Sequence, residues 1–431
     1  MHERSSSREW AKRADGLTYG CAMSDQAVDA FAFVLDLLDR VDPSDRVDDA
    51  DLDAWNELAD RAEDIALALE DGVLDEVRVA ELSTLIAASE LSDSHTREAV
   101  AWGIDRALWP TFTHLWLAAR GGSGPLLPGE WFPVTDVDRE LLPDHPTSLP
   151  SRLSVRAGEL PHVRRFDQVG QVAVHVDHDF AETIDAALAS IAHMATIHPN
   201  ADATDFAVPE ARVPLFPVRP GNSDQANRIA GLATEALLRS PVVVGPELAC
   251  PPVGELEPVR HSFPGLEPRL FVIGSRHEVT DTGERVNRAL LLVGPDASLH
   301  HHKFAPYIAG DAPEGISPRA PALTMLVSRE WRVVIAVCKD LLSPDVVATL
   351  CRIGANVVLV PAWSPKLDAF RAAAEMLVSH CHALVLVANG PPRNADDEDI
   401  ASMLGRPLRA DTVRSAPHPC EPTIITWPVW E

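Results

Sequence analysis

The feature that most limits the fold of this chain is an alternation, starting near residue 166, between short apolar runs and helical patterns. The runs hold five or six residues, mostly aliphatic, between Gly, Pro and Asn, as buried strands do. They cover 171–176, 241–245, 270–274, 289–293, 333–337, 356–360 and 384–388. Helices are expected between them at 180–195, 223–239, 367–382, and from the cap Ser343 to Gly354. Residues 166–431 therefore read as an α/β domain.

The first third of the chain has a helical pattern instead. Apolar residues recur every three or four positions over 27–41, 52–69 and 77–86, and a fourth helix begins near Ser94. We expect residues 1–125 to form an all-α helical domain, joined to the α/β domain by a Pro/Gly-rich linker at 126–165.

Three tryptophans mark the fourth helix. Trp102, Trp109 and Trp116 are seven residues apart, which places them on nearly the same face, and Pro110 should kink the helix. Aromatic stripes are usually buried, so we expect the three side chains to form part of the core between this domain and the next one. The alternative is a docking surface for a protein partner.

The charge balance argues against two classes of partner. Asp and Glu number 64 against 37 Lys and Arg, a formal net charge of −27 over 431 residues, which repels nucleic acid and anionic membranes. The six cysteines include no CxxC pair, as suits a reducing compartment. The N-terminus has no apolar stretch of a secretory signal, and no run approaches the ~20 residues of a membrane helix. The sequence predicts a soluble cytoplasmic protein.

Three segments place a reactive side chain just beyond a predicted strand, where α/β sheets usually build their sites. Glu247 follows the strand 241–245, and Lys303 follows the strand 289–293 and a turn. Cys338 follows the strand 333–337 directly. The three side chains are therefore the first candidates for chemistry.

These segments resemble the motifs of the nitrilase (carbon–nitrogen hydrolase) superfamily, in the family's order. The matching motifs are Pro246-Glu247, the stretch from Asn287 to Lys303, and Cys338-Lys339-Asp340; further blocks are 354–363, the Arg371/Glu375 helix and 387–390. The resemblance covers roughly the C-terminal half and none of the first 160 residues. It implies an αββα sandwich and assembly into homo-oligomers, dimers or larger.

The resemblance also implies a Glu-Lys-Cys triad. Cys338 would be the nucleophile and Glu247 its base, while Lys303 and the backbone N–H of Lys339 stabilise negative charge on the substrate. The expected activity is hydrolysis of a non-peptide C–N bond in a small amide, rather than a nitrile, through a thioester. Transfer of the acyl group is possible with the same thioester. The chemistry requires no metal and no organic cofactor.

Four further residues are candidates for substrate binding. The family often has a second acidic residue eight positions after the lysine; Asp311 stands there, and Glu314 is its rival. Lys339, where the family commonly has an aromatic or small polar residue, hints at an anionic substrate. Tyr307 and Trp363 are candidates for the pocket wall.

Two alternatives concern the site itself. Glu210 also follows a strand and a proline, so it competes with Glu247; only one of them can reach both Cys338 and Lys303. The tract 300–302 contains three histidines, but neighbours on a strand point to opposite faces, which favours surface histidines over a metal site.

A different class of function fits the sequence as well. The helical first third lies outside the resemblance, and both Lys339 and Asp311 depart from the family pattern. The nitrilase-like half could therefore be a catalytically silent or partner-activated binding module that the helical domain regulates.

Overall fold

The structure is a computed structural model. It describes residues 28–38, 41, 51–67, 73–120, 122–134, 163–189, 191, 193–208, 214–265, 268–309, 312–391, 402–406, 412–415 and 422–426. These residues form two compact units. The first draws on residues 1–122, 131–134 and 147–165, and the second on residues 123–130, 135–146 and 166–431. No helix among the described residues is long and apolar enough to cross a membrane.

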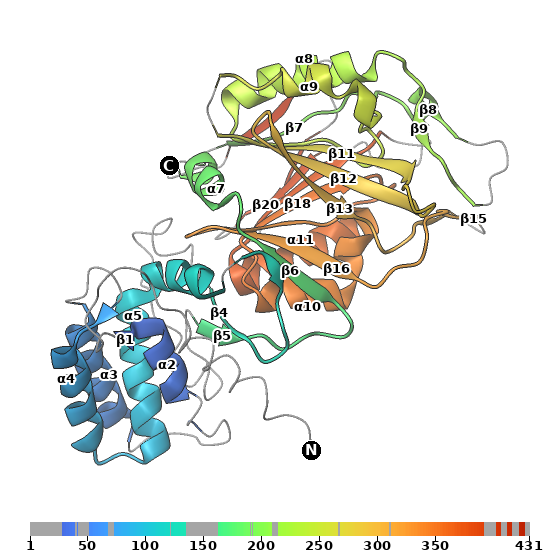
Figure 1. The fold of residues 1–431 in the computed structure, drawn as a ribbon. Coiled ribbons are helices and arrows are strands. Elements are labelled where there is room, and N and C mark those ends of the chain that lie inside the picture. Colours follow the sequence, from blue (N-terminus) through green and yellow to red (C-terminus); the bar gives the residue numbers. More distant parts are fainter. Residues whose placement is uncertain are drawn as a thin grey trace. The chain divides into compact units, whose positions relative to one another are not determined.

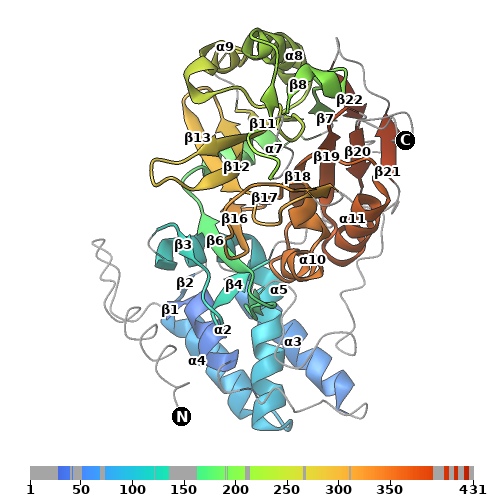
Figure 2. The same ribbon diagram turned by 90° about the vertical axis from the view of Figure 1, so that its right-hand side faces the viewer.

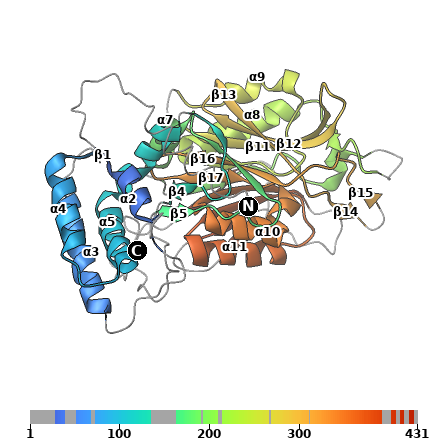
Figure 3. The same ribbon diagram turned by 60° about the horizontal axis from the view of Figure 1, so that its bottom comes forward.

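The first unit is mainly helical. Its helices are α2 (Ala30–Leu38), α3 (Leu52–Ala66), α4 (Glu76–Ala87) and α5 (Asp93–Arg120), labelled in Figure 3. Two short antiparallel pairs accompany them: β1 (Val28–Asp29) with β2 (Val73–Leu74), and β4 (Trp131–Pro133) with β5 (Val163–Arg165). These pairs depart from the all-α prediction, and β4 and β5 lie within the predicted linker. Helix α5 continues through Pro110.

Two of the three tryptophans on α5 are buried. Trp102 packs edge to face against Trp55 of α3, with ring centroids 5.3 Å apart, and Trp116 lies under the Arg120 guanidinium. The side chain of Trp109 lies outside the described residues. Trp102 therefore belongs to the core of the helical unit itself, and not to an exposed docking surface.

The second unit contains two large sheets. The six-stranded sheet has the order β13 (Ala297–His302), β12 (Arg285–Val293), β11 (Leu270–Val279), β10 (Val242–Val244), β7 (His193–Thr196), β22 (Thr423–Thr426). The eight-stranded sheet has the order β21 (Thr412–Ser415), β20 (Ser402–Gly405), β19 (Leu384–Asn389), β18 (Val357–Ala362), β17 (Arg332–Ile335), β16 (Ala322–Val327), β6 (Ala173–Asp177), β3 (Gly124–Pro125). Strands β17, β18 and β19 run parallel, as do β7, β10 and β11.

Helices cover the outer faces of the two sheets, which gives four layers (Figure 1). Helices α8 (Gln225–Arg239) and α9 (Glu257–Arg260) lie over the six-stranded sheet. Helices α10 (Pro344–Arg352) and α11 (Asp368–Cys381) lie over the eight-stranded sheet, as Figure 2 also shows. Every residue of β18 and β19 is buried, because one face meets the other sheet and the other meets the helices. The αββα layering agrees with the sequence prediction.

The seven predicted strands all occur, but one predicted helix is too long. Helix α7 (Ala181–Leu188) ends well before Ala195, since His193–Thr196 forms β7 and pairs in parallel with Val242–Val244. Pairing with a central strand outweighs the local helical pattern there. Two short hairpins lie between the large elements: β8 (Phe206–Ala207) with β9 (Arg219–Pro220), and β14 (Ile308–Ala309) with β15 (Ala312–Pro313).

Candidate active site

The two sheets bring Glu247, Lys303 and Cys338 together. Glu247 lies beyond the end of β10 and Lys303 directly follows β13, both in the six-stranded sheet, whereas Cys338 lies beyond β17 in the eight-stranded sheet. The Glu247 backbone N–H donates to the carbonyl of Ala362, at the end of β18, with an N···O distance of 3.2 Å, which joins the two sheets at this point. All three side chains are buried, with exposed fractions of 4%, 0% and 3%.

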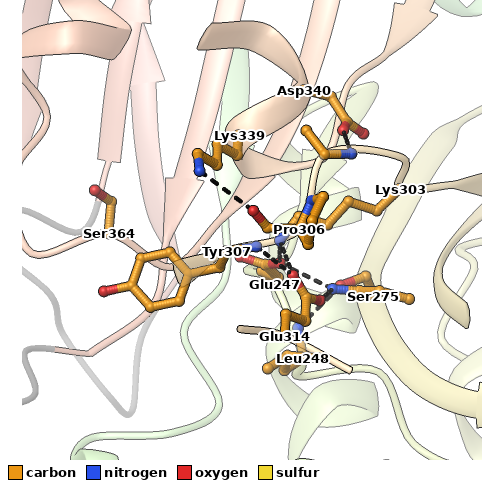
Figure 4. A network of polar contacts seen from close by, with 12 residues as sticks. Glu247, Leu248, Ser275, Lys303, Pro306, Tyr307, Glu314, Lys339, Asp340 and Ser364 are labelled. Carbon is orange, nitrogen blue, oxygen red and sulfur yellow. Dashed lines mark hydrogen bonds and ion pairs between the residues drawn. The ribbon is translucent and has the colours of Figure 1, made fainter. Parts of the chain in front are cut away.

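The Lys303 ammonium lies between two carboxylates (Figure 4). Its Nζ donates to Oε1 of Glu247 at 2.7 Å and to Oε2 of Glu314 at 2.6 Å. Asn287 bridges the same carboxylates, because its Nδ2 donates to Oε1 of Glu247 at 2.9 Å and to Oε1 of Glu314 at 2.8 Å. Burial alone lowers the pKa of Lys303, but Glu247 and Glu314 outweigh it and hold that pKa above its ordinary value. Lys303 is therefore a permanent cation here.

Glu314 is the second acidic residue at this site. Besides Lys303 and Asn287, the backbone N–H of Tyr307 donates to its Oε2 at 2.9 Å, and His277 Nε2 lies 2.9 Å from its Oε1. His277 Nδ1 accepts the backbone N–H of Val218 at 3.0 Å, so Nε2 carries the proton and donates it to Glu314. Burial raises the pKa of Glu314, but Lys303 and the His277 hydrogen bond bring it below its ordinary value.

Cys338 occupies a left-handed backbone conformation, with φ of 49°, at the first residue of the 3₁₀ turn Cys338–Leu342. L-residues with side chains rarely adopt this conformation, and such strain gathers at functional sites. Burial raises the pKa of the thiol, and the negative charge of Glu247 raises it further. The Lys303 charge and a hydrogen bond from the Trp363 backbone act in the opposite direction. The resting nucleophile is thus a buried thiol under the influence of a neighbouring carboxylate.

Asp340 ties the nucleophile turn to the segment after Lys303. Its Oδ1 accepts the backbone N–H groups of Phe304 and Ala305, with N···O distances of 3.2 and 2.8 Å. Asp340 is fully buried, and His301 approaches its Oδ2 at 3.5 Å. Lys303 and Cys338, which come from different sheets, are thereby held in a fixed relation.

Of the residues predicted to bind substrate, the described ones lie around the network of Lys303. Trp363 is buried against Phe206, with ring centroids 4.3 Å apart, and its Nε1 donates to Pro391. Tyr307 contacts Glu314 through its backbone, and Lys339 Nζ donates to the Pro306 carbonyl at 3.3 Å. Glu247 contacts Lys303, which was one half of the spatial criterion set for it and its competitor. Asp311 and Glu210 lie outside the described residues.

The histidine tract forms the end of β13. His301 points into the unit, toward Asp340, while His300 and His302 point to the other face. Burial and the charges of Arg319 and Arg288 lower the pKa of His302 to about 4. Within the described part of the chain, no group of three or more His, Cys, Asp or Glu side chains is placed to hold a metal ion.

Sequence reasoning missed the roles of His277 and Asn287. They are direct partners in the antiparallel pairing of β11 with β12, so their side chains lie on the same face. The available signal was weak: Asn287 is the one buried polar residue of β12, but in β11 the buried residues Ser275 and Arg276 are polar as well as His277. Their partner Glu314 was named only as the rival of Asp311.

Comparisons with known proteins complete the description. No protein-family model and no curated protein matches the sequence. Among solved structures, a nitrilase-superfamily amidase from Nesterenkonia AN1 is 18% identical over 55% of this chain and 89% of its own, with a TM-score of 0.40. Nit3 from Saccharomyces cerevisiae, of branch 10 of the nitrilase superfamily, is 14% identical over 55% and 90%, with a TM-score of 0.42.

A third similar structure is the CN-hydrolase superfamily protein XC1258 from Xanthomonas campestris. It is 14% identical over 55% of this chain and 91% of its own, with a TM-score of 0.39. All three come from the superfamily that the sequence motifs resemble, and the similarity lies in one region.

Proposed function

We propose that this chain is a nitrilase-type hydrolase that cleaves a non-peptide C–N bond, an amide in preference to a nitrile, through a thioester on Cys338. The proposal rests on one observation. The Glu247 carboxylate lies 2.7 Å from the Lys303 ammonium, and both charges act on the buried Cys338 thiol, whose pKa Glu247 raises and Lys303 lowers. A nucleophile, a base and a fixed cation thus lie together in a buried site.

The first half-reaction forms the thioester. Because the pKa of Cys338 is raised, the thiol keeps its proton at rest, so proton transfer to Glu247 accompanies attack of the sulfur on the carbonyl carbon. Glu247 then gives this proton to the nitrogen as the C–N bond breaks. Ammonia or an amine leaves, and the acyl group stays on Cys338.

Two donors are available for the oxyanion of the tetrahedral intermediate. Lys303 uses two of its three N–H bonds on Glu247 and Glu314, which leaves one for the substrate oxygen. The backbone N–H of Lys339, next to the nucleophile, is the second donor in this proposal. Preorganised donors of this kind typically contribute about 100-fold or more to the rate.

The second half-reaction reverses the roles. Water attacks the thioester carbon and loses a proton to Glu247, and the C–S bond breaks as Glu247 returns a proton to the sulfur. The free acid leaves and Cys338 is a thiol again. An acyl acceptor other than water would turn the same intermediate into an acyl-transfer product.

Intact-protein mass spectrometry tests this proposal. The full chain and its Cys338→Ala variant are incubated with small amides, nitriles and N-carbamoyl compounds, with and without hydroxylamine. We expect released ammonia and an acyl adduct in the unsubstituted chain only, and a hydroxamate when hydroxylamine intercepts the thioester. Equal ammonia release by the Cys338→Ala variant would contradict a thioester mechanism.

Burial of the site favours a second candidate function, a partner-activated module. Cys338 is 3% exposed and Lys303 is fully buried, so movement of the surrounding loops would widen the access of a substrate to them. The first unit, or a protein partner bound to it, could govern that movement. This candidate becomes the better one if the folded full chain forms no adduct and releases no ammonia with any compound of the panel.

A further inference from the structure

Lys339 places a positive charge beside the nucleophile. It directly follows Cys338 in the 3₁₀ turn, and its side chain is only partly exposed. Within the described part of the chain its Nζ makes one hydrogen bond, to the Pro306 carbonyl at 3.3 Å, and no ion pair with a carboxylate. Lysine is also rare in this protein, since the only others are Lys12, Lys303 and Lys366.

A structural role explains this lysine poorly. The Pro306 contact ties the nucleophile turn to the segment after Lys303, but Asp340 already ties the same two segments with two hydrogen bonds to Phe304 and Ala305. An ammonium with one neutral acceptor among the described residues keeps two N–H bonds for another partner. An anionic group is the partner that compensates such a cation best.

Hydroxyl groups extend to the same side. In Figure 4 the side chains of Lys339, Tyr307 and Ser364 lie on the side away from Lys303 and Glu314. Ser364 Oγ donates its proton to the Lys366 carbonyl at 2.7 Å, so the Lys339 ammonium, and not this hydroxyl, is the donor that an anion would meet here. The catalytic network keeps its own charges on the other side, because Lys303 is enclosed by Glu247 and Glu314.

We propose that the substrate amide carries a carboxylate that pairs with the Lys339 ammonium. This inference rests on the proposed function of the same site. The carboxylate could belong to the acyl part, as in the monoamide of a short dicarboxylic acid, or to the leaving side, as in an N-carbamoyl amino acid. Because the protein has a net charge of −27, its mean field repels an anion, and a local cation is what would select one.

Matched pairs of compounds test the inference by activity. The acyl-side pair is 4-carbamoylbutanoate and pentanamide, and the leaving-side pair is N-carbamoyl-β-alanine and propylurea. We expect kcat/KM for the anionic member of one pair to exceed that of its neutral partner by about 10- to 100-fold. In Lys339→Met this preference should vanish, because kcat/KM falls more for the anionic compound than for its neutral partner. Arg239→Met, which removes a positive charge at the far end of α8, is the control and should keep the preference.

Binding separates this inference from the proposed function. Calorimetry of the Cys338→Ala variant with 4-carbamoylbutanoate or N-carbamoyl-β-alanine needs no catalysis. We expect an affinity about 10- to 100-fold higher than after the additional change Lys339→Met. Binding without turnover in the unsubstituted chain would support the carboxylate subsite and refute the hydrolase. Turnover with equal kcat/KM for anionic and neutral compounds, an equal loss for both in Lys339→Met, or equal affinities in the two binding variants would overturn the subsite.

Discussion

Replacement of Glu314 by glutamine tests the site most sharply, because the Glu314 carboxylate is the acceptor for four donors. Oε1 accepts from Asn287 Nδ2 at 2.8 Å and His277 Nε2 at 2.9 Å. Oε2 accepts from Lys303 Nζ at 2.6 Å and from the Tyr307 backbone N–H at 2.9 Å. Glutamine keeps the shape but presents an NH₂ group in place of one oxygen, so in either orientation two buried donors face a third.

The neighbours of Glu314 cannot adapt without loss. His277 cannot offer Nε2 as an acceptor unless Nδ1 takes the proton, which would oppose the Val218 N–H. Asn287 cannot turn its amide unless it withdraws its NH₂ from Glu247. Each unpaired buried donor costs about 1–3 kcal/mol, and Lys303 also loses a charged partner. We therefore expect Glu314→Gln to lower the free energy of unfolding by about 4 kcal/mol, or the melting temperature by about 8–16 °C.

The assay compares Glu314→Gln with Asp311→Asn, the matched change at the residue that the sequence favoured. Melting of the full chain measures stability whether or not the protein is an enzyme. On an amide that the protein hydrolyses, Glu314→Gln should lower kcat/KM by about 100-fold or more through displacement of Lys303, and Asp311→Asn by less than about threefold. A Glu314→Gln variant that melts like the unsubstituted chain would refute this reasoning. A larger effect of Asp311→Asn would make Asp311 the second carboxylate.

Three further outcomes are expected. Burial and the Glu247 charge raise the pKa of Cys338, so Glu247→Gln should speed the alkylation of Cys338 by iodoacetamide near pH 9, while it abolishes hydrolysis. Mass spectrometry measures the alkylation rate. Burial lowers the pKa of His198 from 6.5 to about 4, so between these pH values the unfolded chain binds a proton at His198 and the folded chain does not. The free energy of unfolding should therefore fall by about 3 kcal/mol from pH 6.5 to 4. In denaturant titrations, His198→Asn should remove this contribution to the pH dependence. Gly274→Ala should lower the melting temperature because its Cβ would lie 2.2 Å from the Pro246 carbonyl oxygen at a φ of 114°, whereas Gly231→Ala, in open space on helix α8, should raise it slightly.

The sequence was sufficient to place the ends of the strands. The runs before Glu247 and Cys338 are apolar because both sheet faces are buried, so their ends are visible without any knowledge of the partner strands. Residues at such ends meet when the sheets pack, and the proximity of Glu247 and Cys338 follows from that rule. Lys303 instead follows β13, a partly exposed edge strand that the apolar runs did not predict. The local apolar pattern was therefore enough to predict the site residues that lie at the ends of the buried strands.

Counting positions could not identify the second carboxylate. The segment after Lys303 folds back on itself as the hairpin of β14 and β15, and the Glu314 backbone N–H donates to the Tyr307 carbonyl at 2.7 Å. This return places a residue eleven positions after the lysine next to its ammonium, with a distance of 2.6 Å. The length of the hairpin decides which acidic residue lies next to the Lys303 ammonium, and this length cannot be read from the spacing of residues in the sequence.

The position of His277 depends on an irregularity of the strand that carries it. Before the bulge at Val272–Gly274, Phe271 and Ile273 face helices α8 and α9, so regular alternation would turn His277 to the same side. The extra residue in β11 reverses the alternation, and His277 instead faces Asn287 and Glu314. Gly274 permits this bulge through its positive φ and its close approach to Pro246. The same glycine thus orients His277 and lies against the residue that precedes Glu247, so one irregularity of the backbone sets the positions of both acidic groups around Lys303.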